Sequence, residues 1–411
     1  MTPVVLLRQI FDEAIAAVQP SICLPKHIPN PPLGRTIVLG AGKASAAMAK
    51  TLEEKWPWPL EGLVITRYGH KIENKRINIV EASHPIPDQI GLKASQQILE
   101  YTKDLTSRDL VIVLISGGGS SLLTLPSDGL SLDDKKKINI ALLKSGAPIS
   151  SINCVRKHIS AIKGGRLARA VAPARLETLI ISDVPGDDTA TIASGPTVPD
   201  PTTFEDAIFI IKKYNIDMPY NALIHLEKGL DESPKPGDKC FTNASTKLIA
   251  SPSIALKAAE KSAIKAGYKV LHLGDIIEGE ARVVALEHAK QALATKQGTI
   301  IISGGELTVT LTGNGAGGPN TEYCLALAQS LNGAPNIYAL ACDTDGIDGS
   351  EDNAGALIGP DTLKSAADLN LDPNFYLKNN NSYEFFQKID GLIHTGPTLT
   401  NVNDFRAILV G

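Results

Sequence analysis

The sequence lacks the features that mark several large classes of protein. Its five cysteines are scattered and include no CxxC pair, so we expect neither a disulfide framework nor a zinc site built on paired sulfur ligands. With a formal net charge of −4 and no basic run, it has no electrostatic footprint for nucleic acid. No apolar run approaches the roughly 18 residues that cross a bilayer. We therefore expect a soluble, cytoplasmic protein with reduced thiols and neither nucleic-acid nor membrane partners.

The remaining composition is that of an ordinary globular protein, with 43% hydrophobic and 20% charged residues. A chain of 411 residues is too long for one core, and we predict two domains, residues 1–235 and 236–411. Residues 199–241 are rich in Pro, Asp and Lys, which favours a linker there. The final apolar run, residues 407–410, could return to either domain.

Short β-branched runs alternate with helical periods, which predicts an α/β fold. We expect a larger N-terminal domain with a Rossmann-like parallel sheet and flanking helices, and a smaller C-terminal α/β domain. The expected strands of the first domain are residues 36–39, 63–66, 77–80, 110–115 and 178–182. Those of the second are residues 270–273, 299–303, 307–311 and 337–341.

A glycine turn, residues 40–46 (GAGKASA), joins the first strand to a helix. Glycine in such a turn lets backbone N–H groups approach a phosphate. A dinucleotide site also needs an acidic residue at the end of the next strand, which here reads Thr66-Arg67-Tyr68. A Walker loop is excluded as well, because Lys43 is followed by Ala44 rather than Ser or Thr. A tight turn without a ligand remains an alternative.

A second glycine turn carries a stronger signal. Three consecutive glycines follow the strand LVIVLI, at a conformational cost that packing alone does not justify. Such a turn presents several N–H donors in a concave nest, and the flanking serines add hydroxyl groups. We expect it to hold the phosphates of a nucleotide, with contacts from Ser116, Gly117, Gly118, Gly119, Ser120 and Ser121.

Acids and bases follow other predicted strands. Asp183, Asp187 and Asp188 come directly after the strand ETLII, where they would reach the edge of the sheet that carries the glycine turns. Carboxylates beside phosphates suit Mg²⁺, although a solvated acidic turn is the alternative. Upstream, NCVRKHIS leads into KGGRLA, a cationic helical segment whose glycine pair is unfavourable for a helix.

Taken together and in order, these motifs resemble the glycerate 2-kinase family, whose C-terminal part is called the MOFRL domain. The resemblance runs from about Gly40 to Asp404 through GAGKAS, SGGGSS, ISDVPGDD, IASGPT, SGGELTVT, DTDGIDG and TGPTLTNVND. It implies a two-domain enzyme that uses ATP and Mg²⁺ to phosphorylate D-glycerate at its 2-hydroxyl. Some members are labelled hydroxypyruvate reductases.

The resemblance also implies that Lys43 and Asp183 lie at an active centre between the domains. Many relatives have an Arg where this chain has Pro319, so we expect Arg156, Lys157 or Lys43 to supply the missing positive charge, or the substrate to differ slightly. We predict Lys43, Asp183 and Arg156 as catalytic residues. The expected substrate contacts are Lys157, His158 and Asn320, and the expected magnesium ligands are Asp187 and Glu306.

Two rival functions remain open at this point. The first glycine turn and the older family label favour an NAD(P)-dependent hydroxypyruvate reductase, against which stands the missing acid after Thr66. A binding protein without catalysis is the other alternative. The sequence leaves the oligomeric state open, with a homodimer as one candidate.

Overall fold

The computed structural model describes residues 1–411, and its chain forms two compact units. The first unit comprises Cys23–Ser182 and Asp187–Ile249, and the second comprises Met1–Ile22, Asp183–Gly186 and Ala250–Gly411. This division differs from the boundary after residue 235, because the N-terminal helix α1 (Pro3–Ala17) packs against elements of the C-terminal part, including β12. Phe11 of α1 and Phe405 of β12 have ring centroids 5.6 Å apart.

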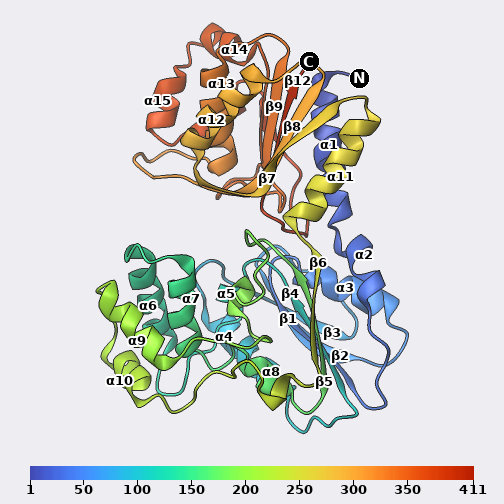
Figure 1. The fold of residues 1–411 in the computed structure, drawn as a ribbon, viewed down its shortest axis with the longest axis vertical. Helices are drawn as coiled ribbons and strands as arrows, with labels where there is room; N and C mark the ends of the chain where they lie inside the picture. Colours follow the sequence, from blue (N-terminus) through green and yellow to red (C-terminus); the bar gives the residue numbers. More distant parts are fainter. The chain divides into compact units, whose positions relative to one another are not determined.

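A six-stranded sheet forms the centre of the first unit, in the order β3-β2-β1-β4-β5-β6 (Figure 1). The pairings from β3 through to β5 are parallel. Its strands are β1 Thr36–Ala41, β2 Glu61–Arg67, β3 Ile77–Ala82, β4 Leu110–Ile115, β5 Arg175–Ile181 and β6 Ala244–Ala250. Chain order reverses between β1 and β4, whose last residues Ala41 and Ile115 are paired. Ligands of open α/β sheets bind outside the carboxyl ends of the strands at such a reversal.

The helices of this unit include a group, α6, α7, α9 and α10, that Figure 1 shows together on one side of the sheet. The unit contains η1 Pro25–His27, α3 Ser45–Lys55, α4 Gln89–Glu100, α5 Gly119–Leu122, α6 Leu132–Lys144, α7 Ile149–His158, α8 Arg166–Val171, η2 Ile192–Ser194, α9 Phe204–Lys213, α10 Tyr220–Lys228 and η3 Lys239–Phe241. A further short helix, α2 Pro20–Cys23, spans the point where the two units divide.

The predicted linker, residues 199–241, is wrong in part, because it contains α9 and α10. A capping box starts α9: the Thr203 side chain accepts from the backbone N–H of Asp206, and the Asp206 side chain accepts from that of Thr203. The buried Phe204, Ala207 and Ile211 of α9 then pack in one cluster with residues of α6, α7 and α10. The helical pattern of α9 is short and lies between Pro- and Lys-rich segments, so the composition of residues 199–241 as a whole indicated a linker.

The second unit also has a six-stranded sheet, in the order β11-β10-β9-β12-β8-β7. Its strands are β7 Lys269–Glu280, β8 Thr299–Thr308, β9 Ile337–Asp343, β10 Gly355–Ile358, β11 Leu392–Ile393 and β12 Asp404–Val410. The final strand β12 pairs antiparallel with both β8 and β9. The apolar run 407–410 therefore belongs to this sheet. The helices are α1, α11 Pro252–Lys265, α12 Ala281–Ala294, α13 Pro319–Leu331, α14 Thr362–Asp368, α15 Pro373–Lys378 and α16 Ser382–Lys388.

The separate strand predicted at residues 307–311 is wrong. Strand β8 continues through Gly304 and Gly305 as far as Thr308, so the glycine pair does not end it. Gly305 has φ +123°, and a Cβ there would lie 2.1 Å from the carbonyl oxygen of Ile277. The glycine thus permits a close approach to β7, where the register of the β7–β8 pairing shifts between Gly274 and Ile277. Each helix of the chain falls short of the length and apolar character needed to cross a membrane.

Candidate active site

The first glycine turn uses its own N–H groups to hold the protein together. Gly42 N donates to the carbonyl oxygen of Ile65 at 3.0 Å, and Lys43 N donates to that of Gly117 at 2.8 Å. Ala44 N donates to Ser116 Oγ at 2.9 Å. Gly42 has φ +148°, and a Cβ there would lie 2.1 Å from Ser116 Oγ. Glycine is therefore required here for contact with the second turn.

The second glycine turn leaves three backbone donors, the N–H groups of Gly117, Gly118 and Ser120, outside its own hydrogen bonds. Gly119 N donates to the carbonyl oxygen of Ser116, and Ser121 N to that of Gly118. The N–H groups of Gly117 and Gly118 take no part in this pattern. Gly118 is left-handed, with φ +79°, as the residue before α5. This turn can therefore present backbone donors to a ligand, whereas Gly42, Lys43 and Ala44 of the first turn already use theirs within the protein.

Two side chains lie against the second turn. A Cβ on Gly118 would come within 3.0 Å of the His84 ring and 3.4 Å of Lys43 Cγ. Lys43, predicted as catalytic, is thus beside the predicted phosphate turn. His84 received no role from the sequence, yet it follows the end of β3, and the strand-end rule that selected the other residues would also have selected it.

The three serines of the turn have different surroundings. Ser116 is fully buried, and its Oγ lies 3.2 Å from Ser45 Oγ as well as accepting from Ala44 N. Ser121 Oγ donates to the carbonyl oxygen of Gly118 at 3.1 Å. Ser120 Oγ lies 2.6 Å from Ser194 Oγ. Ser116 thus joins the two turns, and the predicted phosphate contacts of all three hydroxyls stay predictions.

A strained segment packs against this turn. Ala193, Ser194 and Gly195 have φ values of +53°, +58° and +57°, and left-handed residues other than glycine cost about 1–3 kcal/mol each. Ser194 is fully buried and donates to Asn153 Oδ1 at 3.3 Å in addition to its contact with Ser120. The motif IASGPT therefore packs against the second glycine turn and is held there by side-chain hydrogen bonds.

Helix α7 carries three predicted site residues, Arg156, Lys157 and His158. Arg156 is the one of the three without a carboxylate partner. Its Nε donates to Asn139 Oδ1 at 2.9 Å, and burial lowers its pKa. The next residue, Lys157, points elsewhere, because neighbouring residues of a helix do not face the same side. The remaining guanidinium donors of Arg156 are suited to an anionic ligand.

Lys157 and His158 take part in a buried cluster of charged groups instead. Lys157 Nζ lies 3.3 Å from Asp200 Oδ1, and His158 Nε2 lies 3.0 Å from Glu232 Oε1. His158 Nδ1 also lies 2.8 Å from the carbonyl oxygen of Cys154. These contacts tie α7 to the loops around α9 and α10. The predicted substrate contacts of both residues stay predictions.

Asp183 belongs to the second unit, where two asparagines hold it. Asn401 Nδ2 donates to Asp183 Oδ2 at 3.1 Å, and Asn403 Nδ2 donates to the carbonyl oxygen of Asp183. Thr344 of the DTDGIDG segment donates to the carbonyl oxygen of Asn403 at 2.7 Å. The structure thus brings together three motifs that are far apart in the sequence. The sequence presents Asn401 and Asn403 only as part of the motif TGPTLTNVND, with no local signal of their contact with Asp183.

Asn320 lies in the interior of the second unit. Its Nδ2 donates to Asp404 Oδ1 at 2.7 Å, and its backbone N donates to Asp348 Oδ1 at 2.9 Å. Burial raises the pKa of Asp348 to about 6, although backbone and hydroxyl donors oppose the rise. Asp404 pairs with the buried Arg406 at 3.1 Å. Asn320 is only 1% exposed, and its predicted substrate contact stays untested.

The two predicted magnesium ligands differ in their surroundings. Asp187 of the first unit has φ +58°, and its buried Oδ1 has no hydrogen-bond partner. Glu306 of β8 in the second unit is exposed. No group of three or more His, Cys, Asp or Glu side chains has the arrangement of a metal site. Their assignment to magnesium stays a prediction.

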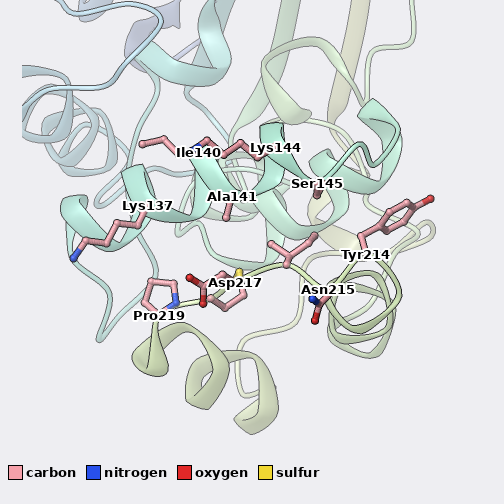
Figure 2. Close-up of a pocket in the computed structure, with 11 residues that line it drawn as sticks. Lys137, Ile140, Ala141, Lys144, Ser145, Tyr214, Asn215, Asp217 and Pro219 are labelled. Carbon is pink, nitrogen blue, oxygen red and sulfur yellow. The ribbon is translucent and has the colours of Figure 1, made fainter.

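Figure 2 shows a hollow of about 700 Å³ on another part of the first unit. Residues of α6, among them Lys137 and Lys144, form one side of it, and the connection from Tyr214 to Pro219 forms the other. None of the predicted site residues lines this hollow. The candidate site therefore rests on the strand ends and not on this cavity.

Comparisons with known proteins agree with the order of motifs. Residues 6–227 match the family described as "Domain of unknown function (DUF4147)", and residues 299–404 match the MOFRL family. A D-glycerate 2-kinase of Thermotoga maritima is 38% identical over 97% of this chain and 96% of its own. The chain belongs to the glycerate 2-kinase family.

A solved structure and a further relative are also similar to this chain over nearly its whole length. The crystal structure of a glycerate kinase from Thermotoga maritima has a TM-score of 0.89, with 37% identity over 99% of both chains. A protein of Agrobacterium vitis with the provisional name hydroxypyruvate reductase is 52% identical over 99% of this chain and 94% of its own. Relatives of this chain thus have both enzyme names that the sequence analysis left open, glycerate kinase and hydroxypyruvate reductase.

We predict that Ser116→Ala lowers the free energy of unfolding by about 1–3 kcal/mol, because it leaves the buried N–H of Ala44 without its acceptor. Urea unfolding would measure the loss. Ser107→Ala changes an exposed serine and should have almost no effect. Equal stability of the two variants would show that Ser116 does not join the turns.

We also predict that Glu232→Gln destabilises the protein in a pH-dependent way. Burial alone would raise the pKa of Glu232, but the N–H groups of Phe204 and Ser233, Lys235 and the charge of His158 lower it to about 2. Because the pKa of Glu232 is lower in the folded protein than the 4.5 of the unfolded chain, its carboxylate stabilises the fold at pH values above 4.5. This stabilisation is lost as the pH falls towards 2.

The loss at pH 7 should be about 1 kcal/mol, since Glu232 is partly exposed and solvent screens its charges. Thermal unfolding of the two proteins from pH 7 to pH 2 would follow it. Glu227→Gln, at an exposed position of α10, is the control. A difference between wild type and Glu232→Gln that stays constant down to pH 2 would contradict the role of this carboxylate.

Proposed function

We propose that this enzyme transfers the γ-phosphoryl group of ATP to the 2-hydroxyl of D-glycerate, giving 2-phosphoglycerate and ADP. The observation that carries the proposal is the contrast between the two glycine turns. In the first turn, the N–H groups of Gly42, Lys43 and Ala44 are bonded within the protein, whereas the second turn keeps those of Gly117 and Gly118 out of its own hydrogen bonds and lies beside Lys43. The name of the Thermotoga maritima relative supports the choice of substrate.

The phosphates of ATP bind at residues 116–121 in this proposal. Backbone N–H groups in a glycine-rich nest bind anions without the desolvation cost of a buried charged side chain. The ammonium group of Lys43 stabilises the charge on the transferred phosphoryl group, as cations do in other phosphoryl-transfer enzymes. Lys43 follows the end of β1 by two residues, and the hydrogen bond of its backbone N–H to Gly117 fixes its place, so it needs little reorganisation for this task.

Asp183 orients the attacking hydroxyl. The bond from the 2-oxygen to the γ-phosphorus forms as the bond from that phosphorus to the β,γ-bridging oxygen breaks, and Asp183 accepts the hydroxyl proton. The hydrogen bond from Asn401 Nδ2 to Oδ2 and the contact of Asn403 with the backbone restrict the carboxylate to one orientation. A fixed general base shortens the search for a reactive geometry.

Arg156 is the proposed partner of the glycerate carboxylate. It is half-buried and has no carboxylate of its own, which favours the binding of an external one. Lys157, His158 and Asn320 already have protein partners, so this proposal gives them a structural task.

Magnesium is the expected cofactor, and Asp187 fits it best. Its buried Oδ1 has no hydrogen-bond partner, which is unusual for a carboxylate unless a ligand completes it. Glu306 is the second candidate, and one or two carboxylates with phosphate oxygens are the set that Mg²⁺ prefers. When bound, the ion neutralises charge on the β- and γ-phosphate oxygens.

A nicotinamide-dependent reductase of hydroxypyruvate is the second candidate. The strand order of the first sheet is that of dinucleotide-binding folds, and the name of the Agrobacterium vitis relative favours this function. Against it, the N–H groups of Gly42, Lys43 and Ala44 in the first turn are already bonded within the protein, and β2 ends on Thr66 and Arg67 without an acid for the ribose.

An assay with enolase as the only coupling enzyme would decide between the two functions. Enolase converts 2-phosphoglycerate, but not 3-phosphoglycerate, into a product that absorbs in the ultraviolet. Absorbance that depends on D-glycerate, ATP and Mg²⁺ supports the proposal and its regiochemistry. Oxidation of NADH or NADPH by hydroxypyruvate, without phosphorylation of glycerate, would overturn it.

We predict that Lys43→Met lowers kcat by about 10²- to 10³-fold, because it removes a charge that acts mainly in the transition state. The fold should persist, as the backbone contacts of Lys43 do not need its side chain. Steady-state kinetics and thermal unfolding measure both effects. Lys55→Met, at an exposed position of α3, is the matched control, and a kcat for Lys43→Met equal to that of the control would remove Lys43 from the site.

A further inference from the structure

Three cationic side chains of the first unit gather without any carboxylate partner: Lys135 of α6, Arg156 of α7 and Lys163 after α7. We call them the cationic trio. Lys135 is 4% exposed and Lys163 is 1% exposed. Lys135 Nζ has no hydrogen-bond partner at all. Arg156 Nε bonds only to the neutral amide of Asn139. The nearby Lys157, in contrast, has its own partner in Asp200.

Burial of unpaired like charges is unfavourable for the fold. Burial lowers the pKa of Lys135 to about 7, and the charge of Arg156 adds to the effect. Burial, together with the charges of Lys135 and Arg156, also lowers the pKa of Lys163 well below its usual value. Such an arrangement weakens the folded state, and sites of this kind are typical of ligand binding. A small anion between the three groups would remove the repulsion.

The cationic trio lies beside the second glycine turn. Lys163 Nζ donates to the carbonyl oxygen of Ser120 at 2.6 Å and lies 3.4 Å from both Ser120 Oγ and the carbonyl oxygen of Ala193. These acceptors are neutral, so the charge of Lys163 is not balanced by them. An anion bound by the trio would therefore be a close neighbour of a group held by residues 116–121.

We propose that Lys135, Arg156 and Lys163 form the subsite that binds the carboxylate of a 2-hydroxy acid. This inference rests on the proposed function, because it assumes the phosphoryl transfer described there. It adds Lys135 and Lys163, two lysines without an assigned role, to the proposed contact between Arg156 and the substrate carboxylate. In a 2-hydroxy acid, the hydroxyl is one carbon from the carboxylate. A carboxylate anchored beside the phosphate turn hence favours phosphorylation of the 2-hydroxyl over the 3-hydroxyl.

The decisive variant is Lys135→Met, which keeps the length of the side chain and removes its charge. We expect the KM for D-glycerate to rise about tenfold or more, the loss typical of a hydrogen bond to a charged group, while the KM for ATP stays unchanged. The ligand-free variant should be as stable as wild type or more stable, because an unpaired buried cation is gone. A purely structural lysine would give the opposite change in stability.

Lys137→Met provides the matched control, since Lys137 lies on the same helix but is exposed and paired with Asp133. Its KM values should equal those of wild type. Arg156→Gln tests the same subsite at a half-buried position and should raise the KM for D-glycerate in the same way. A rise in the KM for ATP alone, in either subsite variant, would overturn the assignment to the acid.

Binding without ATP separates this inference from the proposed function. D-glycerate and D-lactate should each raise the Tm of wild type, and glycerol, which has no carboxylate, should not. Lys135→Met should lose the effect of both acids. If wild type binds the acids in this way but phosphorylates none, the subsite stands and the proposed function fails. If wild type is an active kinase and Lys135→Met binds D-glycerate as tightly, the subsite is refuted.

Discussion

The contact between Ser116 and the backbone of the first glycine turn is the interaction on which the candidate site depends. Ser116 Oγ accepts from Ala44 N at 2.9 Å, and Gly42 is close enough to that oxygen to exclude any side chain. The two turns leave β1 and β4 at the point where the strand order of the sheet reverses. Because they are bonded to one another, Lys43 has a defined place beside Gly118. The first turn is thus a support for the second.

The second unit fixes the carboxylate of Asp183, a candidate site residue, by the same means. Asp183 follows β5 in the sequence, but Asn401 and Asn403 of the C-terminal segment hold it. Thr344 in turn holds Asn403, so a loop after β9 determines the position of a residue about 160 positions earlier. In both units, neutral hydrogen bonds between backbone and polar side chains position the charged groups.

The sequence predicted the regular parts of the fold well, because buried strands and glycine turns are local signals. Residues 36–39 and 110–115 became β1 and β4, and their turns lie together as the strand-end rule requires. The failures depended on contacts far apart in the chain. The helices α9 and α10 are stable through packing on α6 and α7, which no local pattern reveals. Likewise, the local sequence of Lys157 is that of a ligand-binding residue, but in the structure its partner is Asp200, 43 residues later.

The difference between Lys157 and Lys135 shows why the sequence could not rank its own candidates. Both are buried lysines in helical segments with basic neighbours, and composition treats them alike. What distinguishes them is whether a carboxylate lies within reach, since a paired charge is compatible with a purely structural role and an unpaired one is not. Lys157 has Asp200 at 3.3 Å, whereas Lys135 Nζ has no partner. The unpaired charge costs stability in the ligand-free protein, and a compensating anion gives the physical reason for keeping it.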